Sequence, residues 1–205
     1  MDLLEGVENL LASVRVYAEM VDEDIADRKN DPRSMCFWNI HNRVKVTQEI
    51  LAFYAASWPD DPEGEGEMLE RVMTVTRDMF VDAVSSIEKA SKDAVGIYSG
   101  SGIREKSLEV NRFLYLRTII KASADLGYVE PRTMEDWDNL LVIRNLAVHN
   151  NSVSDRSKKF ELAGVQISMR PGRMMKGPVG TFIALTDTAV TLFYRWLEAV
   201  HLKAA

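Results

Sequence analysis

Apolar residues in the first half of the chain recur every three to four positions, which is the spacing of amphipathic helices. In the first such segment, about residues 3–25, they are Leu3, Leu4, Val7, Leu10, Leu11, Val14 and Ala18. Asp31-Pro32 is a cap followed by a proline and predicts a second helix, which Trp58-Pro59 ends near Ser57. A third helix is expected over about 67–95, after an acidic loop, and the Gly/Ser cluster at 99–102 ends it.

The second half of the chain combines helical spacing with one short alternating stretch. A fourth helix is expected over 103–126, closed by Gly127, and a fifth after Pro131, capped by Thr133. Beyond Asn151 the period changes, and three apolar residues alternate with polar ones: Val165, Ile167 and Met169. With the turn pairs that follow and Thr181-Phe182-Ile183, this predicts a hairpin within 164–183, before a last helix that starts at Thr186 or Asp187.

These elements predict an all-α protein: an antiparallel bundle of about six helices with a small β-hairpin before the last helix. The 205 residues suit a single domain, with an acidic helical part (1–98) and a second part (99–205) that carries the hairpin. This length can bury an apolar core without disulfides or metal. The single cysteine, Cys36, excludes an internal disulfide, which suits a reducing compartment.

Charge is distributed unevenly along the chain, whose net charge is -6. Residues 1–98 hold 20 acidic and 10 basic side chains, whereas residues 99–176 hold 9 acidic and 13 basic ones. Two interpretations stay open: the second part presents a basic surface to phosphates, or both parts have solvated helix faces. The start resembles no secretory signal and no apolar run is long enough to span a bilayer, so we expect a cytoplasmic protein with no membrane contact.

The predicted fifth helix contains the most informative residues. From Leu140 to Val148 every residue is apolar except Arg144 and Asn145, and such a helix is buried in a core or an interface. A cation at that position is unfavourable without a partner. The partner is expected to be a carboxylate, a bound anion or a twofold-related copy of the same site.

Arg144, Asn145 and His149 lie within one arc of roughly 140° on this helix. A guanidinium offers paired donors to phosphate oxygens, and an imidazole transfers protons near neutral pH. These groups suit RNA cleavage without a metal, because the ribose 2′-hydroxyl supplies the nucleophile and the protein stabilises charge on phosphorus. The competing interpretation is an interior arginine paired with an acid and a histidine that ends a helix.

The segment Arg144-Asn145-Leu146-Ala147-Val148-His149 resembles the R-x4-6-H motif of the HEPN superfamily, as does its place on a late helix of a bundle. The resemblance implies a homodimeric, metal-independent endoribonuclease without a cofactor, of a toxin–antitoxin or defence system. It assigns Arg144 to the scissile phosphate, His149 to proton transfer and Asn145 to positioning. In a subgroup whose motif continues His-x-Tyr the tyrosine is modified; Asn151 stands there, so that regulation is not expected.

Four further residues are candidates for substrate binding: Asn150, His41, Arg43 and Lys45. His41 and Lys45 share a helix face, which either lines the same cleft or is a partly exposed face that makes ion pairs. With three histidines and no Cys/His spacing, no metal site is expected. The alternative function is a non-catalytic HEPN-like helical protein that binds a nucleotide or a partner protein, such as an antitoxin. A third interpretation is a structural helical dimer without a ligand.

Overall fold

The computed structural model of the chain describes residues 3–149, 153–155, 157–162, 164–173, 175 and 177–204, and these are predominantly helical. The helices and strands are α1 (Leu3–Glu23), α2 (Pro32–Ala56), α3 (Pro62–Ile97), the 3-10 helix η1 (Ser99–Ser101), α4 (Ile103–Val110), α5 (Leu116–Asp125), α6 (Pro131–His149), β1 (Lys158–Leu162), β2 (Val165–Met169) and α7 (Thr181–Ala204). The expected class, an all-α bundle with a small hairpin before the last helix, is confirmed.

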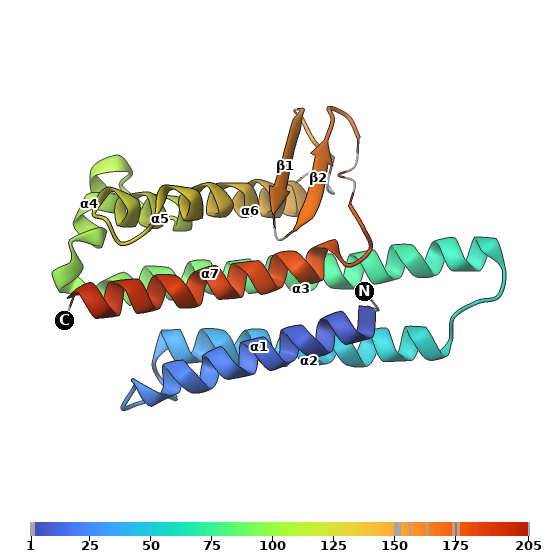
Figure 1. Cartoon of the computed structure of the whole chain (residues 1–205), viewed down its shortest axis with the longest axis horizontal. Helices are drawn as coiled ribbons and strands as arrows, with labels where there is room; N and C mark the ends of the chain where they lie inside the picture. Colours follow the sequence, from blue (N-terminus) through green and yellow to red (C-terminus); the bar gives the residue numbers. More distant parts are fainter. Residues whose placement is uncertain are drawn as a thin grey trace.

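The helices form three layers. α1 and α2 lie side by side in the first layer, α3 and α7 form the middle one, and α4–α6 lie on the far side with the hairpin (Figure 1). The long helices α1, α2, α3 and α7 therefore make a four-helix bundle around a shared apolar core. α5 and α6 pack against α3, so that one side of α3 faces the bundle and the other faces these two helices. Within the described residues, no helix has both the length and the apolar character needed to cross a membrane.

Aromatic side chains tie the bundle core to the outer layer. The rings of Phe37 and Phe193 stack with centroids 5.4 Å apart, and Phe193 stacks in turn on Trp196 at 5.9 Å. The indole N–H of Trp196 donates a 2.9 Å hydrogen bond to Oγ of Ser123 on α5. Because a buried indole needs such an acceptor, this bond fixes α5 against α7. The outer layer is thus packed on the bundle and holds its residues in defined positions.

The expected single helix over 103–126 is wrong, because the chain leaves the helix at residues 111–115. Asn111 is extended (φ -149°, ψ 137°), and its Oδ1 accepts the backbone N–H of Phe113 at 3.0 Å. Tyr115 is also extended, and its N–H donates to Oγ1 of Thr118 at 3.1 Å, which caps α5. Short polar side chains that bond to nearby backbone compete with helix in this way. The break produces α4, a five-residue connection and α5.

Two helix starts also lie earlier than expected. α3 begins at Pro62 and not near 67, because Asp61 accepts the N–H of Gly64 at 2.9 Å and Pro62 suits the first helical position. The supposed acidic loop is therefore partly the first turn of α3. α6 begins at Pro131 itself, so Thr133 lies inside its first turn and is not the cap.

The expected hairpin is present, but it spans 158–169 instead of lying within 164–183, because the strand expected at 181–183 is not its partner strand. β2 coincides with the alternating stretch, and its antiparallel partner is β1, with Leu162 opposite Val165. Gly164 in the connection has φ +69°, a left-handed conformation that favours glycine. Thr181-Phe182-Ile183 belongs instead to the first turn of α7, which starts before the expected Thr186 or Asp187. Successive buried residues there fit both a strand and a fully packed helix, so spacing alone misassigned them.

Candidate functional site

α6 is buried on one side and borders a groove on another. Trp137, Leu140 and Ile143 are almost completely buried against the neighbouring helices, as expected for an apolar helix. Arg144 is half-buried and Asn145 is exposed, and both lie beside α3 and α5 at the edge of this packing. The one permanently charged residue of the apolar stretch therefore sits where protein interior meets solvent.

The Arg144 guanidinium bonds to neutral acceptors. Its Nη2 donates to Oγ of Ser85 on α3 at 3.3 Å, and its Nη1 donates to Oδ1 of Asn145 at 3.1 Å. Its Nε is buried and has no hydrogen-bond partner within the described residues. Among the described residues, no carboxylate forms an ion pair with Arg144. A half-buried cation without a counter-charge favours the binding of an anion.

Ser85 is held in place independently of the arginine. Its hydroxyl donates a 2.7 Å hydrogen bond to the carbonyl oxygen of Val81, one turn earlier on α3. The hydroxyl proton is therefore used within α3, and the oxygen can accept the N–H of Arg144. Asn145 holds the other side of the guanidinium, so α3 and α6 together fix its orientation.

The groove beside Arg144 has a volume of about 750 Å³ and lies between α3, α5 and α6. It is lined by Ser85, Glu88, Lys89, Lys92, Asn111, Tyr115, Leu116, Arg117, Thr118, Leu141, Arg144 and Asn145. Lys92 pairs with Glu88 at 2.8 Å, and Arg117 pairs with Asp138 at 2.9 Å. Lys89 and Arg144 have no ion pair within the described part of the chain, so the groove carries excess positive charge. Phosphate groups are the ligands that such a surface attracts.

His149 occupies the exposed C-terminal end of α6. It lies one turn beyond Asn145, about 6 Å further along the helix axis, and it is not among the residues that line the groove. Asn150, a candidate for substrate binding, lies outside the described residues. The structure thus brings Arg144 and Asn145 together in the groove and leaves the His149 imidazole exposed at the end of α6.

The candidates on α2 are separate from this groove. Arg43 pairs with Asp82 on α3, with 2.9 Å between Nε and Oδ2, and both side chains are partly exposed. The His41 ring lies edge-on to Trp38 with centroids 5.4 Å apart, and no described residue is a hydrogen-bond partner of its buried Nδ1. Lys45 is exposed. None of the three lines the groove beside Arg144, and the ion pair of Arg43 fits the interpretation of a partly exposed, ion-pairing face.

Several groove residues were not identified from the sequence. Lys89 and Lys92 come from α3, and Tyr115 and Arg117 from the start of α5, far from Arg144 along the chain. Ser85, Lys89 and Lys92 do recur at helical spacing, which predicts one polar face of α3. That spacing does not reveal which other helices border the face, so the groove required the tertiary structure.

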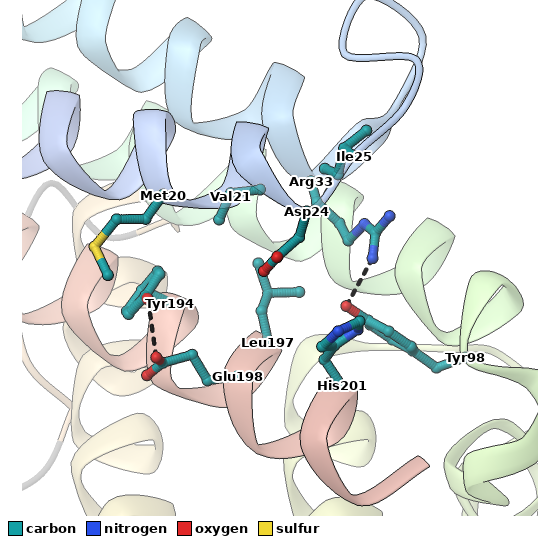
Figure 2. Close-up of a pocket in the computed structure, with 10 residues that line it drawn as sticks. All are labelled: Met20, Val21, Asp24, Ile25, Arg33, Tyr98, Tyr194, Leu197, Glu198 and His201. Carbon is teal, nitrogen blue, oxygen red and sulfur yellow. Dashed lines mark hydrogen bonds between the residues drawn. The ribbon is translucent and has the colours of Figure 1, made fainter. Parts of the chain in front are cut away.

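A second, smaller cavity of about 110 Å³ lies where α1 and α7 meet the start of α2 and the end of α3. Figure 2 shows Arg33, Tyr98 and His201 around one end of it, with Arg33 donating to the Tyr98 hydroxyl at 2.8 Å. At the other end, the hydroxyl of Tyr194 donates to Glu198 at 2.9 Å. Burial, together with Glu198, raises the pKa of Tyr194 to about 12. Four of the polar residues drawn here thus bond in two pairs, Arg33 with Tyr98 between α2 and the end of α3, and Tyr194 with Glu198 along α7.

The described residues contain no group of three or more His, Cys, Asp and Glu side chains arranged to hold a metal ion. Comparisons of the chain with protein-family models, with curated proteins and with solved structures found no match. The groove beside Arg144 is therefore interpreted from its own geometry and chemistry.

Proposed function

We propose that this protein is a HEPN-type, metal-independent endoribonuclease that acts as a homodimer in a toxin–antitoxin or defence system. The observation that carries the proposal is the environment of Arg144. Its guanidinium is half-buried, bonds to a hydroxyl and an amide, and borders a basic groove, and its Nε–H has no partner in the described part of the chain. A phosphate in this groove would supply the missing negative charge and accept paired hydrogen bonds.

The reaction is a transesterification within the RNA strand. The ribose 2′-oxygen attacks phosphorus, the bond from phosphorus to the 5′-oxygen breaks, and the products are a 2′,3′-cyclic phosphate and a 5′-hydroxyl. Arg144 stabilises the negative charge that builds up on the non-bridging oxygens. Asn145 is a positioning residue, because its amide oxygen accepts Nη1 of Arg144 and so orients the guanidinium.

Two protons move during this step, which argues for a dimeric site. A neutral imidazole accepts the proton of the 2′-hydroxyl, and a protonated imidazole donates one to the leaving 5′-oxygen. One histidine cannot serve in both roles at once. Because His149 is exposed at the end of α6, it is free to meet the same residue of a second copy. We therefore assign the two roles to the two copies of His149 in a homodimer.

The test is cleavage of single-stranded RNA in excess chelator. Wild-type protein should produce 2′,3′-cyclic phosphate ends, detected by mass spectrometry of the fragments. Arg144→Ala should lower the rate by about 10²–10³-fold, the usual effect of removing one donor to the developing charge. His149→Ala should lower it by about 10²–10⁴-fold, as for loss of a general acid or base.

Matched controls are Arg71→Ala and His201→Ala, which remove an exposed arginine and an exposed histidine outside the groove. Both should cleave RNA like the wild type. Unchanged cleavage in Arg144→Ala or His149→Ala would overturn the proposal, because the activity would then come from another site. A monomeric mass in light scattering would overturn the dimeric assignment of the two protons.

One observation favours a second candidate, a non-catalytic protein that binds a nucleotide or a partner protein. Arg144 and Asn145 line the groove without His149, which suffices to bind a phosphate but not to move protons. Absence of cleavage with every RNA tried, together with nucleotide binding that Arg144→Ala abolishes, would establish this candidate in place of the nuclease.

A further inference from the structure

The groove beside Arg144 has an aromatic rim. The connection between α4 and α5 carries Phe113 and Tyr115, whose side chains are 54% and 46% exposed. Their rings meet edge to face, with centroids 6.5 Å apart and planes at 73°. Tyr115 and Asn111 line the groove itself. Two neighbouring rings that remain this exposed beside a groove are typical of an interaction surface.

Each of the two rings lies beside a cation. Nζ of Lys92 lies 5.5 Å from the centroid of Tyr115, and the guanidinium carbon of Arg112 lies 4.8 Å from the centroid of Phe113. Lys89 and Arg144 continue this basic character along the groove. Aromatic rings that alternate with cations along a groove are the combination that binds single-stranded nucleic acid, because bases stack on rings while phosphates meet the cations.

Hydrogen bonds hold the backbone of Phe113 and Tyr115 in place. The N–H of Phe113 donates to Asn111 Oδ1 at 3.0 Å, and the N–H of Tyr115 donates to Thr118 Oγ1 at 3.1 Å. The Thr118 hydroxyl donates in turn to the carbonyl oxygen of Tyr115 at 2.8 Å. These bonds use the backbone of both aromatic residues and not their side chains. The ring positions are therefore set by the cap of α5, and a changed side chain at 115 leaves the cap intact.

We propose that Tyr115, flanked by Phe113 and Lys92, is a stacking platform for an unpaired base of the RNA strand whose phosphate binds at Arg144. The choice of RNA rests on the proposed function; the platform itself rests on the rings and cations. A duplex hides the faces of its bases within its own stack, so the platform selects single-stranded or looped RNA. The groove volume of about 750 Å³ lies within the range of sites that enclose small ligands, which allows a nucleotide to enter.

The test measures binding separately from cleavage. The probe is a fluorescein-labelled, 12-nucleotide RNA strand of mixed sequence that is 2′-O-methylated throughout, so that its blocked hydroxyls prevent the reaction. Anisotropy in excess chelator gives Kd for the wild type, Tyr115→Leu and Tyr115→Phe. Tyr115→Leu should raise Kd by between about fivefold and a hundredfold, the range for loss of one stacked base. Tyr115→Phe keeps the ring and should change Kd less than twofold.

The matched control is Phe53→Leu, which removes a ring that is 68% exposed on α2, outside the groove. Its Kd should equal that of the wild type. The same probe annealed to its complement should bind more weakly than the single strand. Equal Kd for Tyr115→Leu and the wild type, or duplex binding as tight as single-strand binding, would overturn the platform. A shift of Tyr115→Leu to a smaller oligomer would also overturn it, because the rings would then be a subunit contact.

Failure of the platform and failure of the nuclease give different results. Probe binding that depends on Tyr115, without cleavage of unmodified RNA, would leave the platform standing and refute the nuclease. RNA cleavage with a KM unchanged in Tyr115→Leu would refute the platform alone.

Discussion

Arg33 and Arg144 are both half-buried arginines that border a cavity, yet their surroundings are opposite. Arg33, at the start of α2, donates from Nη2 and Nε to the two oxygens of Asp31 at 2.7 and 2.9 Å, and from Nη1 to the Tyr98 hydroxyl. Arg144 bonds to a serine hydroxyl and a side-chain amide, and its buried Nε has no partner among the described residues. Within the part of the chain that the structure describes, the first cation has a carboxylate partner and the second has none.

The difference separates a structural arginine from one that is available to a ligand. The hydrogen bond to Asp31 raises the pKa of Arg33 above its ordinary value, against the opposing effect of burial, so the pair is ionised at every physiological pH. The guanidinium of Arg33 also lies over the Tyr98 ring, 5.3 Å from its centroid, which ties α2 to the end of α3. Arg144 makes no comparable network within the described residues, although two hydrogen bonds orient its guanidinium. A cation without a carboxylate partner among the described residues is what distinguishes the groove from the smaller cavity.

Replacing each arginine by methionine, which keeps an unbranched stem and removes the charge, tests this difference most directly. Arg33→Met should lower the free energy of unfolding by about 2 kcal/mol, because it leaves the half-buried Asp31 carboxylate without its charged partner. Arg144→Met should change it by less than about 0.5 kcal/mol, because Ser85 keeps its bond to Val81 and no carboxylate is stranded. Urea unfolding followed by circular dichroism measures both.

The control is Arg15→Met, which removes the exposed ion pair Arg15–Glu19 on the surface of α1. This change should lower the free energy of unfolding only slightly. If Arg144→Met lowered the free energy of unfolding as much as Arg33→Met, Arg144 would be a structural residue. The proposed difference between the two arginines, and with it the proposed anion site, would then be wrong.

Inorganic phosphate should reveal the uncompensated charge directly. A ligand that binds the folded state alone, at ten times its Kd, stabilises that state by about 1.4 kcal/mol. Phosphate should therefore raise the Tm of the wild type and of Arg33→Met, but not that of Arg144→Met. Chloride at equal ionic strength controls for screening. An equal rise in all three proteins would show that phosphate acts through general salt effects and not at Arg144.

Much of the fold could be predicted from the sequence. The class of fold and most helices follow from apolar spacing, because long amphipathic stripes such as that of α1 have one period and clear ends. Some errors occur where short polar side chains compete with the helix, as Asn111 does between α4 and α5. Others occur where the apolar residues fit the spacing of a strand as well as that of a helix, as at the start of α7. Local hydrogen bonds of this kind leave no periodic trace in the sequence.

For the site, spacing on one helix predicted that Arg144 and Asn145 lie together, and the structure brings them together. It did not predict Lys92 or Tyr115, because those residues come from other helices whose packing is fixed by the tertiary fold. Nor did it separate Arg33 from Arg144 by environment: whether an arginine is paired depends on which acid the fold brings within reach. Asp31 is two residues from Arg33, but a near sequence neighbour on a helix often points elsewhere.

Acid should weaken the Arg33 network and leave Arg144 unaffected. Burial acts to raise the pKa of Asp31, but its hydrogen bonds with Arg33 outweigh burial and lower the pKa below its ordinary value. A carboxyl group of this kind contributes stability above its unfolded pKa of about 3.9, and that stability is lost as pH falls through the lower folded value. The difference in unfolding free energy between the wild type and Arg33→Met should therefore be constant from pH 7 to pH 5 and narrow below about pH 4, as urea unfolding at each pH can measure. The difference between the wild type and Arg144→Met should stay flat over the same range, since no carboxylate among the described residues depends on that cation. If the difference in unfolding free energy between the wild type and Arg33→Met did not narrow in acid, Asp31 would not be the partner through which Arg33 stabilises the fold. Arg33 would then no longer be an example of a structural arginine paired with an acid.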